Sequence, residues 1–168
     1  VIMLVRNPIA GVAIRRQLRE EYLESTGDVT IIFCDLTNMA SVSKAADLIM
    51  KTYTRIDGLV CNAGIGSRSK YEQTIDGFES IIQTNCLAHA LLTTILSCGL
   101  QLTNGVVINV SSHVSHATAP FDYDNPFFSE DDYNGYEAYC RSKFMVNIFT
   151  MQAGKRITSG VRFLAIYP

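Results

Sequence analysis

The chain has 168 residues, enough for one ordinary domain with a hydrophobic core. Hydrophobic residues make up 48% of it, which excludes a disordered chain, and a formal net charge of -2 gives no basic excess for binding nucleic acid. The five cysteines, an odd number without a C-x-x-C pair, favour free thiols in a reducing compartment.

Apolar strand-like runs alternate with helical stretches from one end of the chain to the other. The runs predict strands over residues 1–5, 29–33, 56–61, 105–110 and 161–166. Helices are predicted over residues 9–25, 40–53, 75–100 and 135–155, the third of them bent or interrupted near its middle, with a long polar loop over 111–134. This alternation predicts an α/β fold with a doubly wound parallel sheet.

Both ends of the chain bear on its domain organisation. The first strand-like run begins at Val1, with no initiator methionine and no basic segment before it. We therefore expect residues 1–168 to form a single partial domain, truncated at both ends. No charge-free apolar run reaches the roughly 18 residues of a membrane helix, because polar residues interrupt the closest stretch, 86–100.

Polar groups or glycines follow most of the predicted strands. In open α/β sheets, ligands bind outside the carboxyl ends of the strands, so these residues mark the candidate site. They are Arg6, Asp35, residues 61–64 (Cys-Asn-Ala-Gly), Ser111-Ser112 and Tyr167-Pro168. Each has a structural alternative, because serine and asparagine also cap helices and end turns.

Tyr139 and Lys143 form a Tyr-x-x-x-Lys motif inside a predicted helix. Residues four apart share a helix face, so the phenol and the ammonium can point the same way. An ordinary tyrosine has a pKa of about 10, and a fixed positive charge nearby favours its phenolate. The pair therefore suits proton transfer to or from a carbonyl or alcohol oxygen. Taken alone, the spacing is common by chance and more often marks a solvated Tyr and Lys on a helix face.

Four motifs in the same order resemble the short-chain dehydrogenase/reductase family. They are residues 61–64, Asn85 in the next predicted helix, residues 109–112 (Asn-Val-Ser-Ser) and residues 139–143 (Tyr-Cys-Arg-Ser-Lys). The stretches around Asn85 and Tyr139, and the long loop between residues 112 and 139, are most similar to the retinol-dehydrogenase-like branch. The resemblance covers nearly the whole chain and implies a Rossmann-type sheet.

The resemblance implies a catalytic set. Tyr139 matches the acid–base residue, and Lys143 matches the residue that assists it and holds the nicotinamide ribose. Ser112 matches the residue that orients the carbonyl, and Asn85 matches the asparagine that holds a water for proton relay. The activity implied is hydride transfer between a nicotinamide cofactor and a carbonyl or alcohol carbon.

The resemblance also implies a set of cofactor-binding residues. Besides Tyr139 and Lys143 these are Asp35 and Leu36 beside the adenine ring, the turn Asn62, Ala63 and Gly64, and Pro168. Arg6 follows the first visible strand, where an acidic residue would favour NAD and an arginine accommodates a 2′-phosphate. We therefore expect NADP(H) as the cofactor.

The sequence departs from the family pattern at its start. No glycine-rich phosphate loop is present, and Gly64-x-Gly66 is no substitute, because it follows the wrong strand and lacks a third glycine. The family's first strand would lie between the strands at 1–5 and 56–61, whose facing edges are therefore expected to lack partners. We expect the 168 residues alone to fold badly and to bind the cofactor poorly. Cys61 stands where the family often has asparagine.

Three alternatives remain. Ser112 with His113, His116 and aspartates could make a hydrolase, although no G-x-S-x-G elbow exists. A metal could bind His113 and His116 with Asp122 or Asp124. The chain could also be a non-catalytic or regulatory product of a dehydrogenase gene.

The substrate and partners are expected only by analogy. The branch handles lipophilic carbonyls or alcohols of the retinoid, sterol or fatty aldehyde class, and the aromatic residues of loop 119–136 offer a surface for one, unless they only pack beneath the loop. We expect a cytoplasmic protein without nucleic-acid partners. Homodimerisation, and association with the endoplasmic reticulum or lipid droplets through segments outside the chain, are further expectations.

Overall fold

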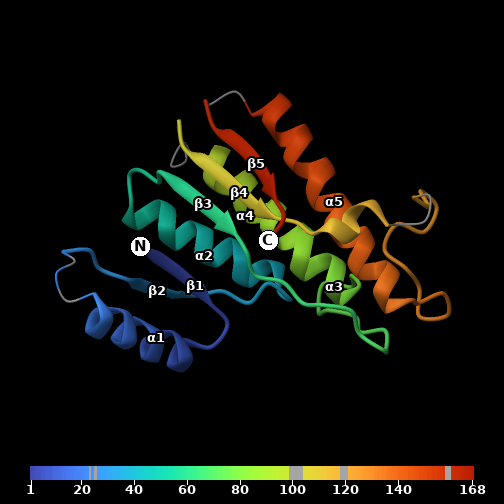
Figure 1. Ribbon diagram of the computed structural model, residues 1–168, viewed down its shortest axis with the longest axis horizontal. Helices are drawn as coiled ribbons and strands as arrows, with labels where there is room; N and C mark the ends of the chain where they lie inside the picture. Colours follow the sequence, from blue (N-terminus) through green and yellow to red (C-terminus); the bar gives the residue numbers. More distant parts are fainter. Residues whose placement is uncertain (23, 25, 99–103, 118–120, 158–159) are drawn as a thin grey trace.

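The computed structural model describes residues 1–22, 24, 26–98, 104–117, 121–157 and 160–168 (Figure 1). Within them, strands alternate with helices in the predicted order. The strands are β1 (Ile2–Val5), β2 (Thr30–Phe33), β3 (Gly58–Cys61), β4 (Val106–Val110) and β5 (Arg162–Ile166). All strand pairs are parallel, which confirms the predicted α/β class.

The described strands form two sheets rather than one. β1 pairs only with β2, while β3, β4 and β5 pair in that order. A cleft separates β1 from β3, and residues of both strands line it. The expectation that the facing edges of these two strands lack partners is therefore confirmed.

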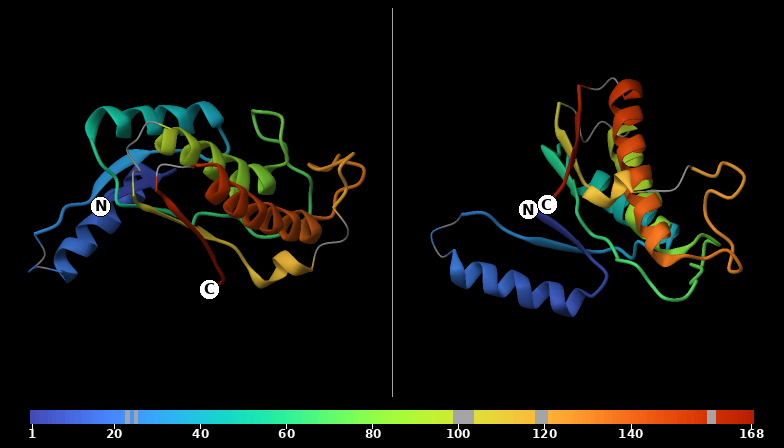
Figure 2. Two further views of the ribbon diagram at one scale, coloured as in Figure 1. Left: turned by 90° about the horizontal axis from the view of Figure 1, so that it is seen from above. Right: turned by 45° about the vertical axis from the view of Figure 1, so that its right-hand side comes forward.

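The helices lie on both sides of the strands. Their bounds are α1 (Pro8–Glu21), α2 (Met39–Thr52), α3 (Ser80–Ile82), the π-helical turn η1 (Gln83–Leu87), α4 (Ala88–Cys98), the 3₁₀ turn η2 (His113–His116) and α5 (Gly135–Arg156). Figure 2 shows α2, α4 and α5 side by side on one face and α1 across the β1–β2 pair on the other. This two-sided arrangement is the doubly wound pattern.

Asparagine side chains begin three of the helices. Asn7 accepts hydrogen bonds from the first turn of α1, Asn38 does so for α2, and Asn134 does so for α5. Their oxygens satisfy backbone N–H groups that have no partner within the helix.

The predicted helix 75–100 is wrong at its start and divided in its middle. Residues 72–80 instead form a tight hairpin, closed by a bridge between Gln73 and Glu79 and by Gly77 at a φ of 85°. The helix then begins at Ser80 and passes through η1, the interruption that the sequence suggests. Residue 100 lies outside the described residues, as does residue 25 at the predicted end of the first helix.

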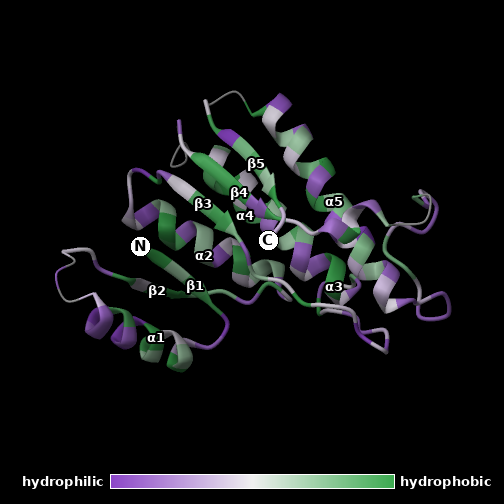
Figure 3. Ribbon diagram, viewed as in Figure 1, coloured by the Kyte–Doolittle hydropathy of each residue, from purple (hydrophilic) through white to green (hydrophobic). Residues whose placement is uncertain are grey.

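Apolar residues concentrate between the strands and the α2–α4 layer. The main core includes Val42, Ala45 and Ile49 from α2 with Leu92 and Leu96 from α4. Figure 3 shows the strands as mostly hydrophobic ribbons. The far face of β3–β5 is bare within the described residues, because side chains there such as Val60 and Leu164 are exposed.

One described segment, Ser80–Cys98, has the length and mean hydropathy of a membrane span. No membrane span was expected here, because polar residues interrupt the apolar run at 86–100. Of its most apolar window, 67% is buried inside the fold. Such burial is what the core helix of a folded domain shows.

Candidate active site

The motif residues on α5 share one face, as predicted. The Lys143 ammonium lies 5.8 Å from the centre of the Tyr139 ring. Lys143 is buried, and its Nζ donates a hydrogen bond to the carbonyl of Val110 at 2.8 Å. Burial lowers the pKa of Lys143, because a charged group loses hydration there.

The two serines after β4 have different environments. Ser111 is buried, and its hydroxyl donates to the backbone carbonyl of Lys143 at 3.2 Å, which joins β4 to α5. Ser112 is only half-buried. In the described part of the chain, neither the Ser112 hydroxyl nor the Tyr139 hydroxyl has a hydrogen-bond partner. Both hydroxyls are therefore free to bind a ligand.

Asn85 lies in η1 and is almost completely buried. Its Oδ1 accepts from the backbone N–H of Ile65 at 2.8 Å, and its Nδ2 donates to the carbonyl of Ile65 and to the Ser142 hydroxyl, each at 3.0 Å. The amide thus fastens the turn after β3 to α5. Because the amide is engaged with protein atoms, its first role in this structure is to position these two segments.

Gly64 makes the close approach in this turn possible. A Cβ at this position would lie 3.0 Å from Oδ1 of Asn85 and 3.7 Å from Nζ of Lys143. The structure therefore brings together the turn after β3, η1 and the middle of α5. Asn62 and Ala63, which precede Gly64, are exposed.

The segment after β2 is held by local hydrogen bonds. The Asp35 carboxylate accepts from the N–H of Thr37 at 2.9 Å and from its hydroxyl at 2.8 Å. The N–H of Asp35 donates to the hydroxyl of Ser41 at 3.0 Å. Asp35 and Leu36 are both half-buried, so their remaining surface can contact a ligand.

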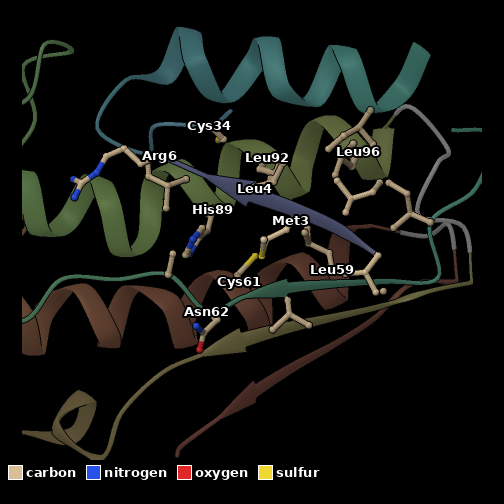
Figure 4. Close-up of a pocket in the computed structure, with 18 of the residues that line it drawn as sticks. Met3, Leu4, Arg6, Cys34, Leu59, Cys61, Asn62, His89, Leu92 and Leu96 are labelled. Carbon is tan, nitrogen blue, oxygen red and sulfur yellow. The ribbon is translucent and has the colours of Figure 1, made fainter. Parts of the chain in front are cut away.

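The cleft between β1 and β3 has a volume of about 900 Å³ and collects most of the expected cofactor residues. Its lining includes Arg6, Asp35, Leu36 and residues 62–64. Figure 4 shows Arg6, Asn62 and His89 toward one end of the cleft and Leu92 and Leu96 toward the other. Ser112, Tyr139, Lys143 and Pro168 lie outside this lining. Arg6 and Pro168 are both exposed.

His89 lines the cleft although it belongs to none of the sequence motifs. It is buried on α4, one turn after Asn85, and burial lowers its pKa to about 4. A lone histidine in an apolar helix is not distinctive in sequence, and only its spacing from Asn85 could have drawn attention to it. Two neighbouring thiols are also unsuited to reaction, because burial raises the pKa of Cys61 to about 11 and that of Cys86 to about 12. All five cysteines are free.

The loop residues offered for a hydrolase or metal site do not assemble into one. His113 and His116 are exposed, and their rings lie 5.4 and 6.0 Å from the ring of Tyr167. The Asp122 carboxylate accepts from backbone N–H groups of its own turn. Across the described ranges, no group of three or more His, Cys, Asp or Glu side chains is placed to hold a metal.

Several aromatic side chains of the loop before α5 pack inside the fold and leave little open surface. Phe128 is buried at a φ of 60°, and the buried guanidinium of Arg141 lies 3.9 Å from its ring centre. Arg141 also donates to the Asn125 carbonyl at 2.7 Å and to the Glu137 carboxylate at 3.0 Å. By contrast, Tyr123 is 85% exposed. Residues 119 and 120 of the expected surface lie outside the described residues.

Comparison with known proteins gives the family. A family model described as short chain dehydrogenase matches residues 1–123. Human retinol dehydrogenase 13 is 35% identical over 136 residues, covering 80% of this chain and 40% of that protein. Human retinol dehydrogenase 12 is 30% identical over 171 residues, covering 100% of this chain and 52% of that protein. The chain thus spans about half the length of these relatives.

Solved structures share the fold. An uncharacterised protein from Mycobacterium paratuberculosis matches with a TM-score of 0.85 and 33% identity, covering 100% of this chain and 58% of its own. A short-chain dehydrogenase from Sphingobium yanoikuyae, solved with NADPH, has a TM-score of 0.71 at 22% identity, with coverage of 99% and 59%. These matches confirm the predicted Rossmann-type fold. Because the family model spans 123 of the 168 residues, the chain belongs to the short-chain dehydrogenase family, within which it resembles the retinol-dehydrogenase-like branch.

Proposed function

We propose that this chain contains the catalytic residues of an NADP(H)-dependent oxidoreductase that interconverts a carbonyl and an alcohol. One observation carries the proposal: Lys143, Asn85 and Gly64 meet beside α5, and the hydroxyls of Tyr139 and Ser112 have no partner among the described residues. Two free hydroxyls and a buried ammonium are the groups that polarise and protonate a carbonyl oxygen.

Each of these residues has a distinct task in the reducing direction. Ser112 donates a hydrogen bond to the substrate oxygen and orients it. Tyr139 donates its phenolic proton to that oxygen, and the Lys143 ammonium stabilises the phenolate that remains. Asn85 keeps the turn at Ile65 and α5 in register through its amide bonds. A nicotinamide held beside Tyr139 and Lys143 would supply the hydride.

The choice of NADP(H) is supported by Arg6. The guanidinium is exposed at the cleft and has no ion-pair partner among the described residues, so it is available to a 2′-phosphate. The Sphingobium relative was solved with NADPH. We expect Arg6→Ala to weaken the binding of NADPH and to leave that of NADH nearly unchanged. Equal or tighter binding of NADH by the unchanged protein would refute the choice.

A lipophilic carbonyl or alcohol of the retinoid, sterol or fatty aldehyde class fits best as substrate. The relatives named retinol dehydrogenase support this class, and so does the exposed ring of Tyr123, which packs on Phe121 next to Phe144 of α5. Steady-state assays of aldehydes of increasing chain length should show kcat/KM rising with length. A preference for short polar aldehydes would contradict the assignment. In the same reading the protein works in the cytoplasm or on the cytoplasmic face of a membrane.

Replacement of Tyr139 by Phe tests the mechanism. The variant keeps the ring and removes the hydroxyl, so turnover should be abolished while the affinity for NADP(H) persists. Tyr136→Phe is the matched control, because Tyr136 is exposed on the same helix and has no lysine four residues later. Turnover retained by Tyr139→Phe, or lost equally in the control, would reject the role.

The alternative is a non-catalytic or regulatory product of a dehydrogenase gene. The unpaired strand edges along the cleft favour it, because no glycine-rich turn for a pyrophosphate lies beside them in the described residues. Calorimetric titration of the native product with NADPH distinguishes the two functions. Reproducible absence of binding would favour the alternative, and binding accompanied by turnover would exclude it.

A further inference from the structure

A fully buried glutamine in η1 connects three segments that are distant in sequence. The Nε2 of Gln83 donates to the carbonyl of Leu36 at 3.2 Å and to the carboxylate of Asp76 at 2.7 Å. Its Oε1 accepts a short hydrogen bond from the hydroxyl of Thr74. A buried amide is tolerated when its donors and acceptor are engaged, and all of these contacts are made here.

Asp76 extends this network to the start of α2. The same Oδ2 atom that accepts from Gln83 also accepts from the N–H of Met39 at 2.8 Å. Met39 is the first residue of α2, so a carboxylate from the hairpin 72–80 satisfies a backbone donor that the helix itself cannot pair. The hairpin, η1 and the beginning of α2 are thus joined at one oxygen atom.

The network holds the segment that carries Asp35 and Leu36. Gln83 fixes the carbonyl of Leu36, while Thr37 and Ser41 fix the carboxylate and the N–H of Asp35. Both Asp35 and Leu36 line the large cleft. Gln83 also lies two residues before Asn85 in the same turn, so one buried side chain links this edge of the cleft to the candidate catalytic residues.

We propose that Gln83 and Asp76 are positioning residues for the adenine end of the cofactor. The inference rests on the proposed function, and it adds two residues that neither the motifs nor the family resemblance assign. Neither side chain needs to touch the ligand. Their task is to keep the backbone of residues 35–38 in the shape that receives the adenine, so that binding does not also have to order this segment.

Cofactor affinity in the full-length protein tests the inference. In Gln83→Leu and Asp76→Ala, the Kd and KM for NADP(H) should rise about tenfold, the effect of one or two lost hydrogen bonds. The kcat and the KM for the carbonyl substrate should stay within about twofold. Asp76→Asn keeps an acceptor for Met39 and should recover part of the affinity. Asp47→Ala is the control, because Asp47 is an exposed acid on α2, the helix that Met39 begins.

Hydrogen exchange provides a readout that does not depend on turnover. The amides of residues 36–41 should exchange faster in Gln83→Leu than in the control. If the unchanged protein binds and turns over NADP(H) while Gln83→Leu binds it equally well, the inference alone is overturned. Loss of kcat at unchanged cofactor affinity, or identical exchange, also overturns it. If the unchanged protein binds no NADP(H), the proposed function fails first and the inference fails with it.

Discussion

Replacement of Gly135 by alanine should destabilise the fold although the residue lies in a helix. Gly135 is buried at the first turn of α5. A Cβ there would lie 1.8 Å from the carbonyl oxygen of Arg68, 2.8 Å from its carbonyl carbon and 2.9 Å from its nitrogen. These are backbone atoms, so no side-chain rotation relieves the overlap. The start of α5 and the segment around Arg68 must move apart by roughly an ångström.

The expected cost follows from three opposing effects. Alanine is favoured over glycine in a helix by about 1 kcal/mol. Overpacking typically costs about 1–3 kcal/mol and sometimes more, and a displaced α5 also weakens the cap at Asn134, a cap being worth about 1 kcal/mol. We therefore expect a net loss of about 1–3 kcal/mol in the free energy of unfolding, or roughly 3–10 °C in Tm.

Urea unfolding and calorimetry of the full-length protein measure this cost. Gly66→Ala is the matched control, because Gly66 is exposed and a Cβ there meets no atom within 4 Å. The control should unfold like the unchanged protein. If Gly135→Ala melts within about 1 °C of Gly66→Ala, the close packing of α5 against Arg68 is refuted.

Three further changes address the site, the loop and the pH dependence. Gly64→Ala places a methyl 3.0 Å from Oδ1 of Asn85. Turnover should therefore fall at least about tenfold with little change in Tm, because the site is displaced. Normal kinetics in this variant would count against the close contact. Arg141→Gln removes the cation–π contact with Phe128, which should lower the free energy of unfolding by about 2–3 kcal/mol and speed proteolysis within residues 121–134. The same change at an exposed arginine of α1 is the control and should have little effect. Burial lowers the pKa of His89 to about 4, whereas an unfolded histidine keeps its value of 6.5. The unfolded state therefore binds more protons between these values, and stability is lost as pH falls from 6.5 towards 4, by about 2 kcal/mol at pH 5. His89→Leu should flatten this slope in urea titrations at several pH values, and an unchanged slope would show that another group is responsible.

Much of the fold was open to prediction from sequence because its signals are local. Runs of branched residues and the spacing of apolar positions depend only on the geometry of strands and helices, and they located β1 to β5 within a few residues. The spacing of Tyr139 and Lys143 likewise predicted a shared face, because four residues make about one helical turn. The helix expected from residue 75 was wrong because the hairpin before Ser80 is held by Gly77 and by a bridge that apolar spacing does not reveal.

Only the tertiary structure decided which polar side chains form hydrogen bonds or packing contacts within the protein. The amide of Asn85 joins Ile65 to Ser142, a contact that its motif does not reveal, and its role in holding a water stays a prediction. Gln83 bonds a carbonyl 47 residues away. The aromatic rings of the long loop pack against Arg141, against one another and against Tyr71, Phe78 and Phe144 outside the loop. A side chain's neighbours across the fold depend on how whole elements pack, and that packing follows from the summed burial of many residues. The spacing of residues along this chain therefore determined its helices and strands and the shared face of Tyr139 and Lys143. The hydrogen-bond partners of its buried polar groups depend on how the helices pack on the sheet.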